Sequence, residues 1–159
     1  MISLKVIIST QQLIVYKNDR LIKQYPISTA KKGVGEMNGS EQTPRGWHIV
    51  RAKIGQKSLL NTVFVERRPT GEIYTPELRK LYPERDWILT RIMWLSGLEK
   101  GKNRLGTVDT MRRYIYLHGT AHEAEIGTPR SRGCVRLKNQ DIVELFDYIP
   151  VKTRLFIQE

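Results

Sequence analysis

Hydrophobic and polar residues alternate through the first third of the chain. Leu4, Val6 and Ile8 lie two residues apart, and Leu13 and Val15 repeat the spacing after a polar pair. Side chains two apart point to the same face of a β-strand, so this pattern predicts paired strands with one buried face. Asn18-Asp19 is expected to turn the chain into a third strand.

Similar apolar runs continue along the chain. They predict strands over residues 21–27, 46–54, 113–117 and 151–157, with loops over 32–42 and 97–106. Residues 87–95 form a buried strand or a short helix, which periodicity does not separate, and a strand is favoured. Residues 64–66 and 72–74 are expected to form a hairpin that turns at Pro69-Thr70-Gly71.

Two segments have helix signals. Thr75 is a capping residue followed by Pro76 at the first helical position, and Pro83 limits this helix to a short one. Asn139 is expected to cap a second, amphipathic helix that Pro150 ends. Its apolar face comprises Ile142, Leu145, Phe146 and Ile149. The fold class is therefore mostly β with two helices, in one domain over residues 1–159, since no internal repeat or linker interrupts the pattern.

Composition limits the classes of partner only weakly. The formal net charge is +11, which suits an anionic partner, but the basic residues are scattered in pairs and no nucleic-acid-binding motif accompanies them. A basic module for nucleic acid or an anionic surface is kept as a remote alternative, and no nucleic-acid partner is expected.

The first eight residues lack a basic head, a long apolar core and a cleavage site. The expected location is therefore cytoplasmic, or periplasmic if a leader has been removed. No apolar stretch has the length of a membrane span, so no membrane partner is expected. The single cysteine excludes an internal disulfide, which also favours a reducing compartment.

That cysteine, Cys134, lies in the run Ser131-Arg132-Gly133-Cys134-Val135-Arg136, a short distance after His118-Gly119-Thr120. A thiol is nucleophilic only as the thiolate, and a neighbouring imidazole and guanidinium groups favour that form. The residues are therefore candidates for acyl transfer, with Cys134 as nucleophile and His118 as general base and acid.

Two other interpretations of these residues remain open. Cys134 can be an inert buried thiol, because free cysteine is often buried. A zinc site built from His118, His122, His48 and Cys134 is disfavoured, because Gly119 and the loop context spoil the helical i,i+4 geometry that the His118–His122 pair would need. No metal or cofactor is expected.

The neighbours of Cys134 have candidate roles of their own. Gly133, with the Cys134 N–H, is expected to supply oxyanion donors, since glycine lets a substrate carbonyl approach the main chain. Arg132 and Arg136 offer planar forks for a substrate carboxylate, although Arg136 can instead anchor the loop. Ser131 can order the turn or bind substrate, and Thr120 is grouped with the substrate-binding residues.

Both motifs together resemble the YkuD-type L,D-transpeptidases. The family has a strand ending in His-Gly before a Ser/Thr-x-Gly-Cys-x-Arg run, and residues 28–35 with 43–49 resemble its second block, "STGKxGxGTPxGxF". Two positions depart from the pattern: Arg132 stands where the family commonly has histidine, and His48 stands where it has an aromatic residue.

This resemblance implies a YkuD-like β-sandwich of mixed sheets and a catalytic Cys134 that carbapenems acylate. It also implies that the Gly119 carbonyl orients His118. The implied substrate is a peptidoglycan stem peptide, cleaved between its third residue, a diamino acid, and the terminal D-alanine. Water as acceptor gives L,D-carboxypeptidation, and an amine of a second stem gives a 3–3 cross-link.

Because wall cross-linking takes place outside the cytoplasmic membrane, the expected location favours an L,D-carboxypeptidase that trims soluble stem peptides or muropeptides during murein recycling. L,D-transpeptidation is the alternative. The oligomeric state stays open.

Overall fold

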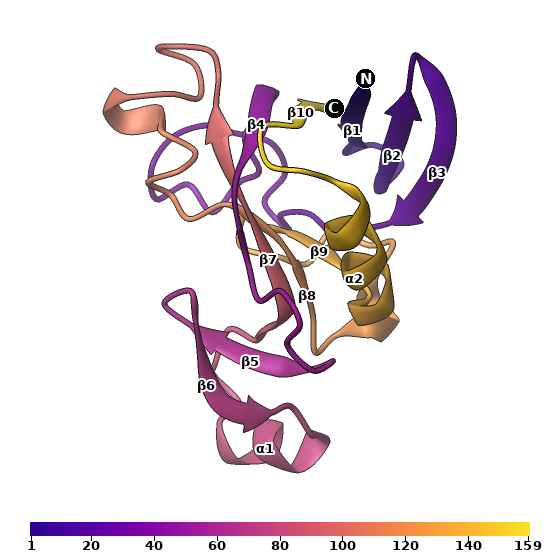
Figure 1. The fold of residues 1–159 in the computed structure, drawn as a ribbon. Coiled ribbons are helices and arrows are strands. Elements are labelled where there is room, and N and C mark those ends of the chain that lie inside the picture. Colours follow the sequence, from indigo (N-terminus) through magenta and orange to yellow (C-terminus); the bar gives the residue numbers. More distant parts are fainter.

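The computed structural model describes residues 1–159 and contains ten strands and two α-helices (Figure 1). The strands are β1 (Ile2–Ile7), β2 (Gln12–Lys17), β3 (Arg20–Pro26), β4 (Gly46–Ile54), β5 (Thr62–Val65), β6 (Arg68–Ile73), β7 (Ile88–Gly97), β8 (Tyr116–Gly119), β9 (Val135–Leu137) and β10 (Arg154–Gln158). The helices are α1 (Pro76–Leu81) and α2 (Asn139–Tyr148), and two single 3₁₀ turns cover Gly106–Val108 and Glu123–Glu125.

Hydrogen bonds join all ten strands into one mixed sheet. Its path is β3-β2-β1-β10-β4-β7-β5-β6, and β8 pairs with β7 and carries β9. The β1–β10 and β8–β9 pairs are parallel and the others are antiparallel. The prediction of a mostly-β fold of mixed strand direction with two short helices is thus confirmed.

The two ends of the strongly curved sheet meet. Ser28, just beyond β3, donates its N–H to the Arg136 carbonyl of β9 and accepts the Arg136 N–H in return, both at 2.9 Å. A second bridge joins Ala30 to Ser131. The N-terminal strands are therefore fixed beside the turn that precedes β9.

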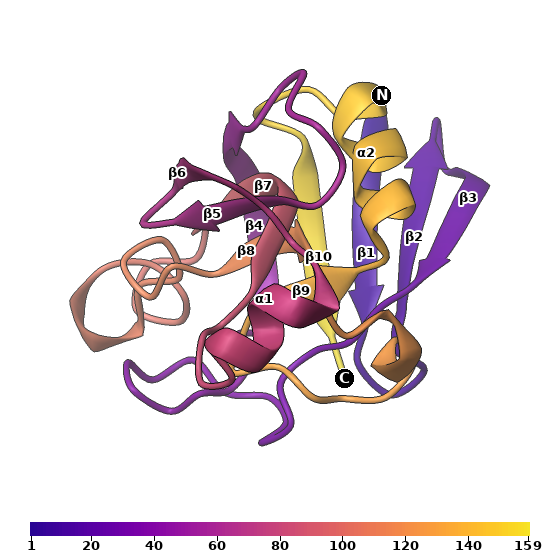
Figure 2. The same ribbon diagram turned by 90° about the horizontal axis from the view of Figure 1, so that it is seen from below.

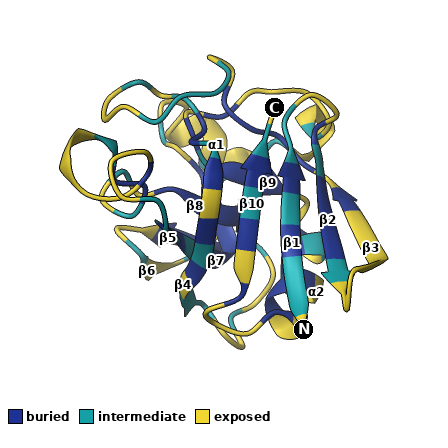
Figure 3. Ribbon diagram, turned by 90° about the horizontal axis from the view of Figure 1, so that it is seen from above, coloured by how far each residue is buried: buried dark blue, intermediate teal, exposed yellow.

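The main core lies inside this curved sheet. It is a cluster of 19 buried hydrophobic residues to which α2 contributes Ile142, Leu145 and Phe146, as the apolar pattern predicts. Helix α2 packs against β7 and β8, while α1 and the β5–β6 hairpin lie at the far end of β7 (Figures 1 and 2). Figure 3 shows burial concentrated in the central strands and exposed residues along β3 and β6. Neither helix combines the length and apolar character that a bilayer crossing requires.

The predicted hairpin forms, but its turn lies elsewhere. Glu66 and Arg67 make the turn with φ of 49° and 64°, and residues 69–71 belong to strand β6. Two successive left-handed residues match the twist of a two-residue hairpin, which is the geometry usually made by Asn-Gly. The sequence prediction followed the Pro-Thr-Gly signal instead and was wrong.

Three other boundaries differ from the sequence prediction. Strand β8 begins at Tyr116 rather than at residue 113, because Tyr114 adopts φ of 57° in a turn. Strand β10 begins at Arg154, and Val151 is exposed in the turn after α2. Helix α2 has Lys138 as its N-cap, since the Asn139 side chain is used elsewhere. Thr75 caps α1 as predicted and accepts the Leu78 N–H at 3.1 Å.

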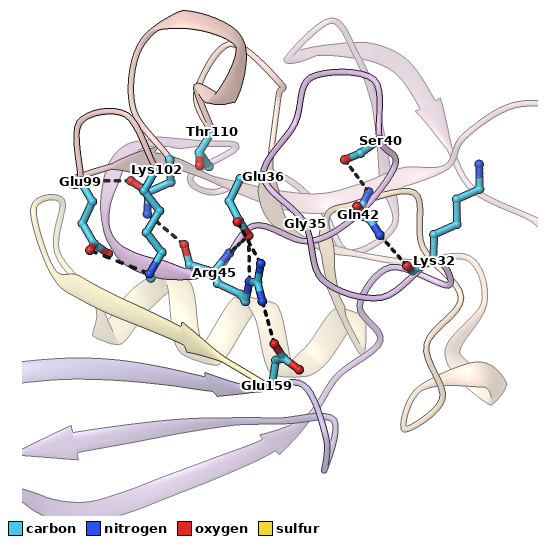
Figure 4. A network of polar contacts seen from close by, with 12 residues as sticks. Lys32, Gly35, Glu36, Ser40, Gln42, Arg45, Glu99, Lys102, Thr110 and Glu159 are labelled. Carbon is cyan, nitrogen blue, oxygen red and sulfur yellow. Dashed lines mark hydrogen bonds and ion pairs between the residues drawn. The ribbon is translucent and has the colours of Figure 1, made fainter.

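An ion-pair network holds the loop over residues 31–45 (Figure 4). The Arg45 guanidinium donates to both oxygens of Glu36, at 3.0 and 3.1 Å, and to Glu159 Oε1 at 2.7 Å. Gln42 closes the loop by donating its side-chain amide to the Lys32 carbonyl at 3.0 Å. This loop carries Thr43 to the neighbourhood of Cys134.

Glu36 makes this network sensitive to pH. Burial alone would raise the pKa of Glu36, but the hydrogen bonds and charge of Arg45 outweigh burial and lower it below its ordinary value. A carboxyl whose pKa is lower in the folded state stabilises the fold above its unfolded pKa, and this contribution is lost as pH falls through the folded pKa.

Glu36→Gln should therefore lower the free energy of unfolding by about 1 kcal/mol at pH 7. The difference from wild type should shrink below about pH 4, where the carboxyl becomes protonated. Urea unfolding from pH 3 to 8 measures both. Glu41→Gln, which removes an exposed pair with Lys32, is the matched control. An equal loss at pH 3 and pH 7 would contradict the assignment.

Candidate active site

A cavity of about 410 Å³ lies between the turn before β9, strand β8 and the β5–β6 hairpin. Cys134 and His118 both line it, as do Ser131, Arg132 and Arg136. The structure therefore gathers five of the eight predicted site residues around one opening.

Ser131 orders the turn that carries Cys134. Its hydroxyl donates to the Cys134 carbonyl at 2.6 Å and accepts the Gly133 N–H at 3.2 Å. Its own N–H bonds to the Thr29 carbonyl. Of the two roles considered for Ser131, these contacts describe the ordering of the turn.

Gly133 has φ of 135°, a conformation that favours glycine. A Cβ here would also lie 3.0 Å from Ile115 Cδ1. Because the Gly133 N–H is bonded to the Ser131 hydroxyl, it is not a free oxyanion donor in this arrangement. The Cys134 N–H has no hydrogen-bond partner within the protein and is therefore an available main-chain donor of the turn.

Thr43 joins the N-terminal block to this turn. It is fully buried, its hydroxyl donates to the Gly133 carbonyl at 2.9 Å, and it accepts the Ala30 N–H at 3.0 Å. The two sequence motifs therefore meet through one side chain, which explains physically why a threonine lies at this position.

The Cys134 sulfur contacts two main-chain groups, one in β8 and one in the turn just before it. Tyr116 N–H donates to Sγ at 3.3 Å, and the thiol donates to the Tyr114 carbonyl at 3.3 Å. Burial raises the pKa of Cys134 to about 12, against the opposing effects of the Tyr116 N–H and the charges of Arg136 and Arg113. The resting thiol is therefore protonated at neutral pH.

His118 is buried in β8, and its Nδ1 lies 2.6 Å from the Gly119 carbonyl. A carbonyl only accepts hydrogen bonds, so Nδ1 carries the proton and Nε2 is left as an acceptor. Burial lowers the pKa of His118. The ring is thus neutral at pH 7 and in the tautomer that can accept a thiol proton.

Close packing fixes Gly119 in turn. A Cβ at this position would collide with the Asn139 side-chain oxygen and lie 2.8 Å from the Leu89 carbonyl. Asn139 accepts from the Thr90 hydroxyl at 2.6 Å and donates to the Thr120 carbonyl at 2.9 Å. Asn139, which the sequence analysis treated as a helix cap, instead supports the strand that holds His118.

Thr120 is placed differently from its prediction as a substrate-binding residue. It is buried, its hydroxyl accepts the His122 N–H at 3.0 Å, and it does not line the cavity. Contact between Thr120 and substrate therefore stays a prediction, and in this structure its side chain is packed inside the domain.

The two arginines of the turn have different surroundings. Arg132 is exposed at the cavity wall and makes no ion pair. Arg136 closes the sheet through its main chain, and its side chain faces the cavity with Nη2 3.6 Å from Asp86 Oδ1. Its Nε is buried without a partner. Arg136 thus combines the anchoring position and the cavity-lining position that the sequence left as alternatives.

His48 is fully buried, with its ring nitrogens 3.0 Å from the Gly46 carbonyl and the Thr110 hydroxyl. His122 lies at the start of a 3₁₀ turn after β8. No group of three or more His, Cys, Asp or Glu side chains is placed to hold a metal ion.

Sequence reasoning missed an aromatic wall of the cavity. Arg67 lies over the Tyr114 ring at 4.8 Å and the Trp94 ring at 5.2 Å, and its Nη1 donates to the Tyr116 hydroxyl at 3.2 Å. About half of the Tyr114 side chain is exposed. The only sequence signal was the pair Arg67-Arg68, and a pair of charged residues is typical of a solvated turn.

Comparison with known proteins agrees with this geometry. Residues 2–157 match the YkuD family, described as the L,D-transpeptidase catalytic domain. The chain belongs to this family.

Curated relatives and solved structures support the assignment. The probable L,D-transpeptidase YbiS of Escherichia coli is 50% identical over 112 residues, which cover 67% of this chain and 35% of that protein. The probable L,D-transpeptidase ErfK/SrfK of Salmonella typhimurium is 30% identical over 128 residues, 79% of this chain and 35% of that protein.

This YkuD domain therefore spans about a third of the length of these two relatives. Among solved structures, L,D-transpeptidase LdtMt1 in complex with imipenem aligns with a TM-score of 0.59 at 17% identity, covering 99% of this chain and 58% of that one, which supports the fold. The chain is an enzyme of the L,D-transpeptidase family.

Thr43→Val should destabilise the domain by about 2 kcal/mol, because it leaves the buried Ala30 N–H and Gly133 carbonyl without their shared partner. Urea unfolding measures the loss. Thr70→Val, at an exposed hydroxyl bonded to Glu72, is the matched control and should change stability by less than about 0.5 kcal/mol. Equal effects of the two substitutions would contradict the structural role of Thr43.

The raised pKa of Cys134 predicts slow alkylation of the resting enzyme. Iodoacetamide should modify Cys134 more slowly than a free thiol at pH 8, and the rate should keep rising through pH 10, since a higher pH increases the thiolate fraction. Mass spectrometry of timed samples measures the rate. A rate that reaches its plateau below pH 7 would show a preformed thiolate–imidazolium pair instead.

Proposed function

We propose that this domain transfers the acyl group of a peptidoglycan stem peptide through a thioester on Cys134. The observation that supports the proposal most strongly is that Cys134 and a neutral His118 of fixed tautomer line one cavity in a domain of this family. Cys134 is the nucleophile, and His118 is the general base and acid.

The proton moves within this pair. His118 Nε2 takes the Cys134 proton as sulfur attacks the carbonyl carbon of the third residue, and the Cys134 N–H donates to the developing oxyanion. The imidazolium then protonates the departing amine of D-alanine, which leaves the thioester. In the second step His118 deprotonates the acceptor, which attacks the thioester and releases the thiol.

The hydrogen bond that orients His118 suits a thiol nucleophile. A backbone carbonyl at Nδ1 orients the ring, as the Gly119 carbonyl does here, but it supplies no full negative charge to stabilise an imidazolium. A thiol is a stronger acid than a serine hydroxyl, so it needs less of this stabilisation.

We further propose that water is the acceptor. The domain is then an L,D-carboxypeptidase that produces a tripeptide from soluble stem peptides or muropeptides in the cytoplasm. Water needs no second peptide-binding site beside a cavity of about 410 Å³, a volume suited to a single ligand. The alternative is L,D-transpeptidation, with an amine of a second stem as acceptor, outside the cytoplasmic membrane. A carbapenem is expected to acylate Cys134 whether the acceptor is water or an amine. One structure with the same fold is a complex with imipenem.

Incubation with a stem tetrapeptide should release D-alanine and give the tripeptide. Cys134→Ala should abolish the product, and His118→Gln should lower kcat by about 10²- to 10⁴-fold, because the general base is lost. Product masses, with and without an added amine, identify the acceptor.

His122→Gln is the control, since His122 lies outside the cavity. A dominant amine-exchanged product would replace hydrolysis by transpeptidation. Product formation that survives Cys134→Ala would contradict the proposed function altogether.

A further inference from the structure

We infer that Arg67 is the carboxylate-binding residue of the cavity and takes the C-terminal carboxylate of the peptide that Cys134 attacks. The inference rests on the proposed function for the identity of the substrate. Recognition of the substrate carboxylate then lies at the tip of the β5–β6 hairpin, outside both sequence motifs.

The Arg67 guanidinium is held in place before any ligand arrives. The Tyr114 and Trp94 rings lie within 4.8 and 5.2 Å of it, and the Tyr116 hydroxyl accepts one of its five N–H groups at 3.2 Å. A cation stacked on aromatic rings loses less side-chain freedom on binding than an arginine in solvent. Arg67 is therefore a preorganised fork on the cavity wall.

Its charge is also available. Arg67 forms none of the seven ion pairs of the protein, although Glu66 adjoins it in the turn. Four of its N–H groups have no partner within the protein. An incoming carboxylate therefore displaces no internal partner from it.

The other three arginines of the cavity are less suited to this role. Arg113 donates to the Gly35 and Gln42 carbonyls and to the Ser40 hydroxyl, and so holds the neighbouring loop. Arg136 already faces Asp86, and Arg132 has no contact that fixes its side chain.

Tyr116 connects this fork to the reacting atom. Its N–H donates to Cys134 Sγ, and its hydroxyl accepts from Arg67. The terminal carboxylate of the substrate is one residue away from the attacked carbonyl, a step of about 3.8 Å between Cα atoms. Arg67 and Cys134 line the same cavity, so a peptide whose scissile carbonyl meets Sγ has its terminal carboxylate in the space that Arg67 borders.

The consequence is a preference for substrates with a free C-terminus directly after the scissile bond. A carboxylate on Arg67 forms charge-assisted hydrogen bonds, which a neutral carboxamide cannot form with the same strength. The selectivity would restrict cleavage to the last residue of a stem.

The test measures binding rather than turnover. In the Cys134→Ala protein, calorimetry compares a synthetic stem tetrapeptide that has a free carboxylate with the same peptide as a C-terminal carboxamide. The acid should bind about 10- to 100-fold more tightly. Arg67→Met should reduce this ratio to within about twofold, and Arg67→Lys, which keeps the charge without the planar fork, should give an intermediate ratio.

Arg68→Met is the matched control, because Arg68 is the next residue of the same hairpin, is exposed and lies outside the cavity. It should leave the ratio unchanged. The inference is overturned if the parent protein shows no preference for the acid, or if Arg67→Met weakens both peptides equally. Cleavage by the wild-type enzyme is measured in parallel: an Arg67-dependent preference without cleavage refutes the proposed function alone, and cleavage without the preference refutes this inference alone.

Discussion

The reciprocal hydrogen bonds between Ser28 and Arg136 are the interaction on which the rest of the structure depends. They join the two ends of the curved sheet, so that the segment after β3 lies against the strand after Cys134. Thr43 can then bond the Gly133 carbonyl and fix the turn. Without this closure, the turn that contains Gly133 would have no fixed position, and the nucleophile would not be aligned with β8.

The site that results is a neutral pair held in a low-dielectric environment. Burial favours the uncharged forms of both Cys134 and His118, and the tautomer set by the Gly119 carbonyl leaves Nε2 to take a proton. The thiolate and the imidazolium therefore form only as sulfur attacks the substrate carbonyl, after the substrate has bound. A thiol that is protonated at rest is also less exposed to adventitious oxidation.

The sequence predicted elements whose causes are local. Alternating apolar residues define β1 and β2, the Thr75-Pro76 cap starts α1, and the stripe that includes Ile142 and Phe146 forms the buried face of α2. Membership of the YkuD family was also predicted from the sequence, because two motifs far apart in the chain carry information that periodicity does not.

Long-range placement was missed. Nothing in the sequence shows that Glu66-Arg67 turns the hairpin over the cavity, that Thr120 points inward or that Asn139 supports β8. Each depends on side chains brought together only by the closed sheet, so propensity alone favoured a Pro-Thr-Gly turn and an asparagine cap.

The central claim is that the reaction passes through an acyl group on Cys134. Acid-quenched samples of the wild-type protein mixed with stem tetrapeptide, followed by intact-mass measurement and peptide mapping, test it most directly. The account predicts a transient adduct with the mass of the tripeptide acyl group on the peptide that contains Cys134. Product that accumulates with no adduct, or an adduct on another residue, would contradict it.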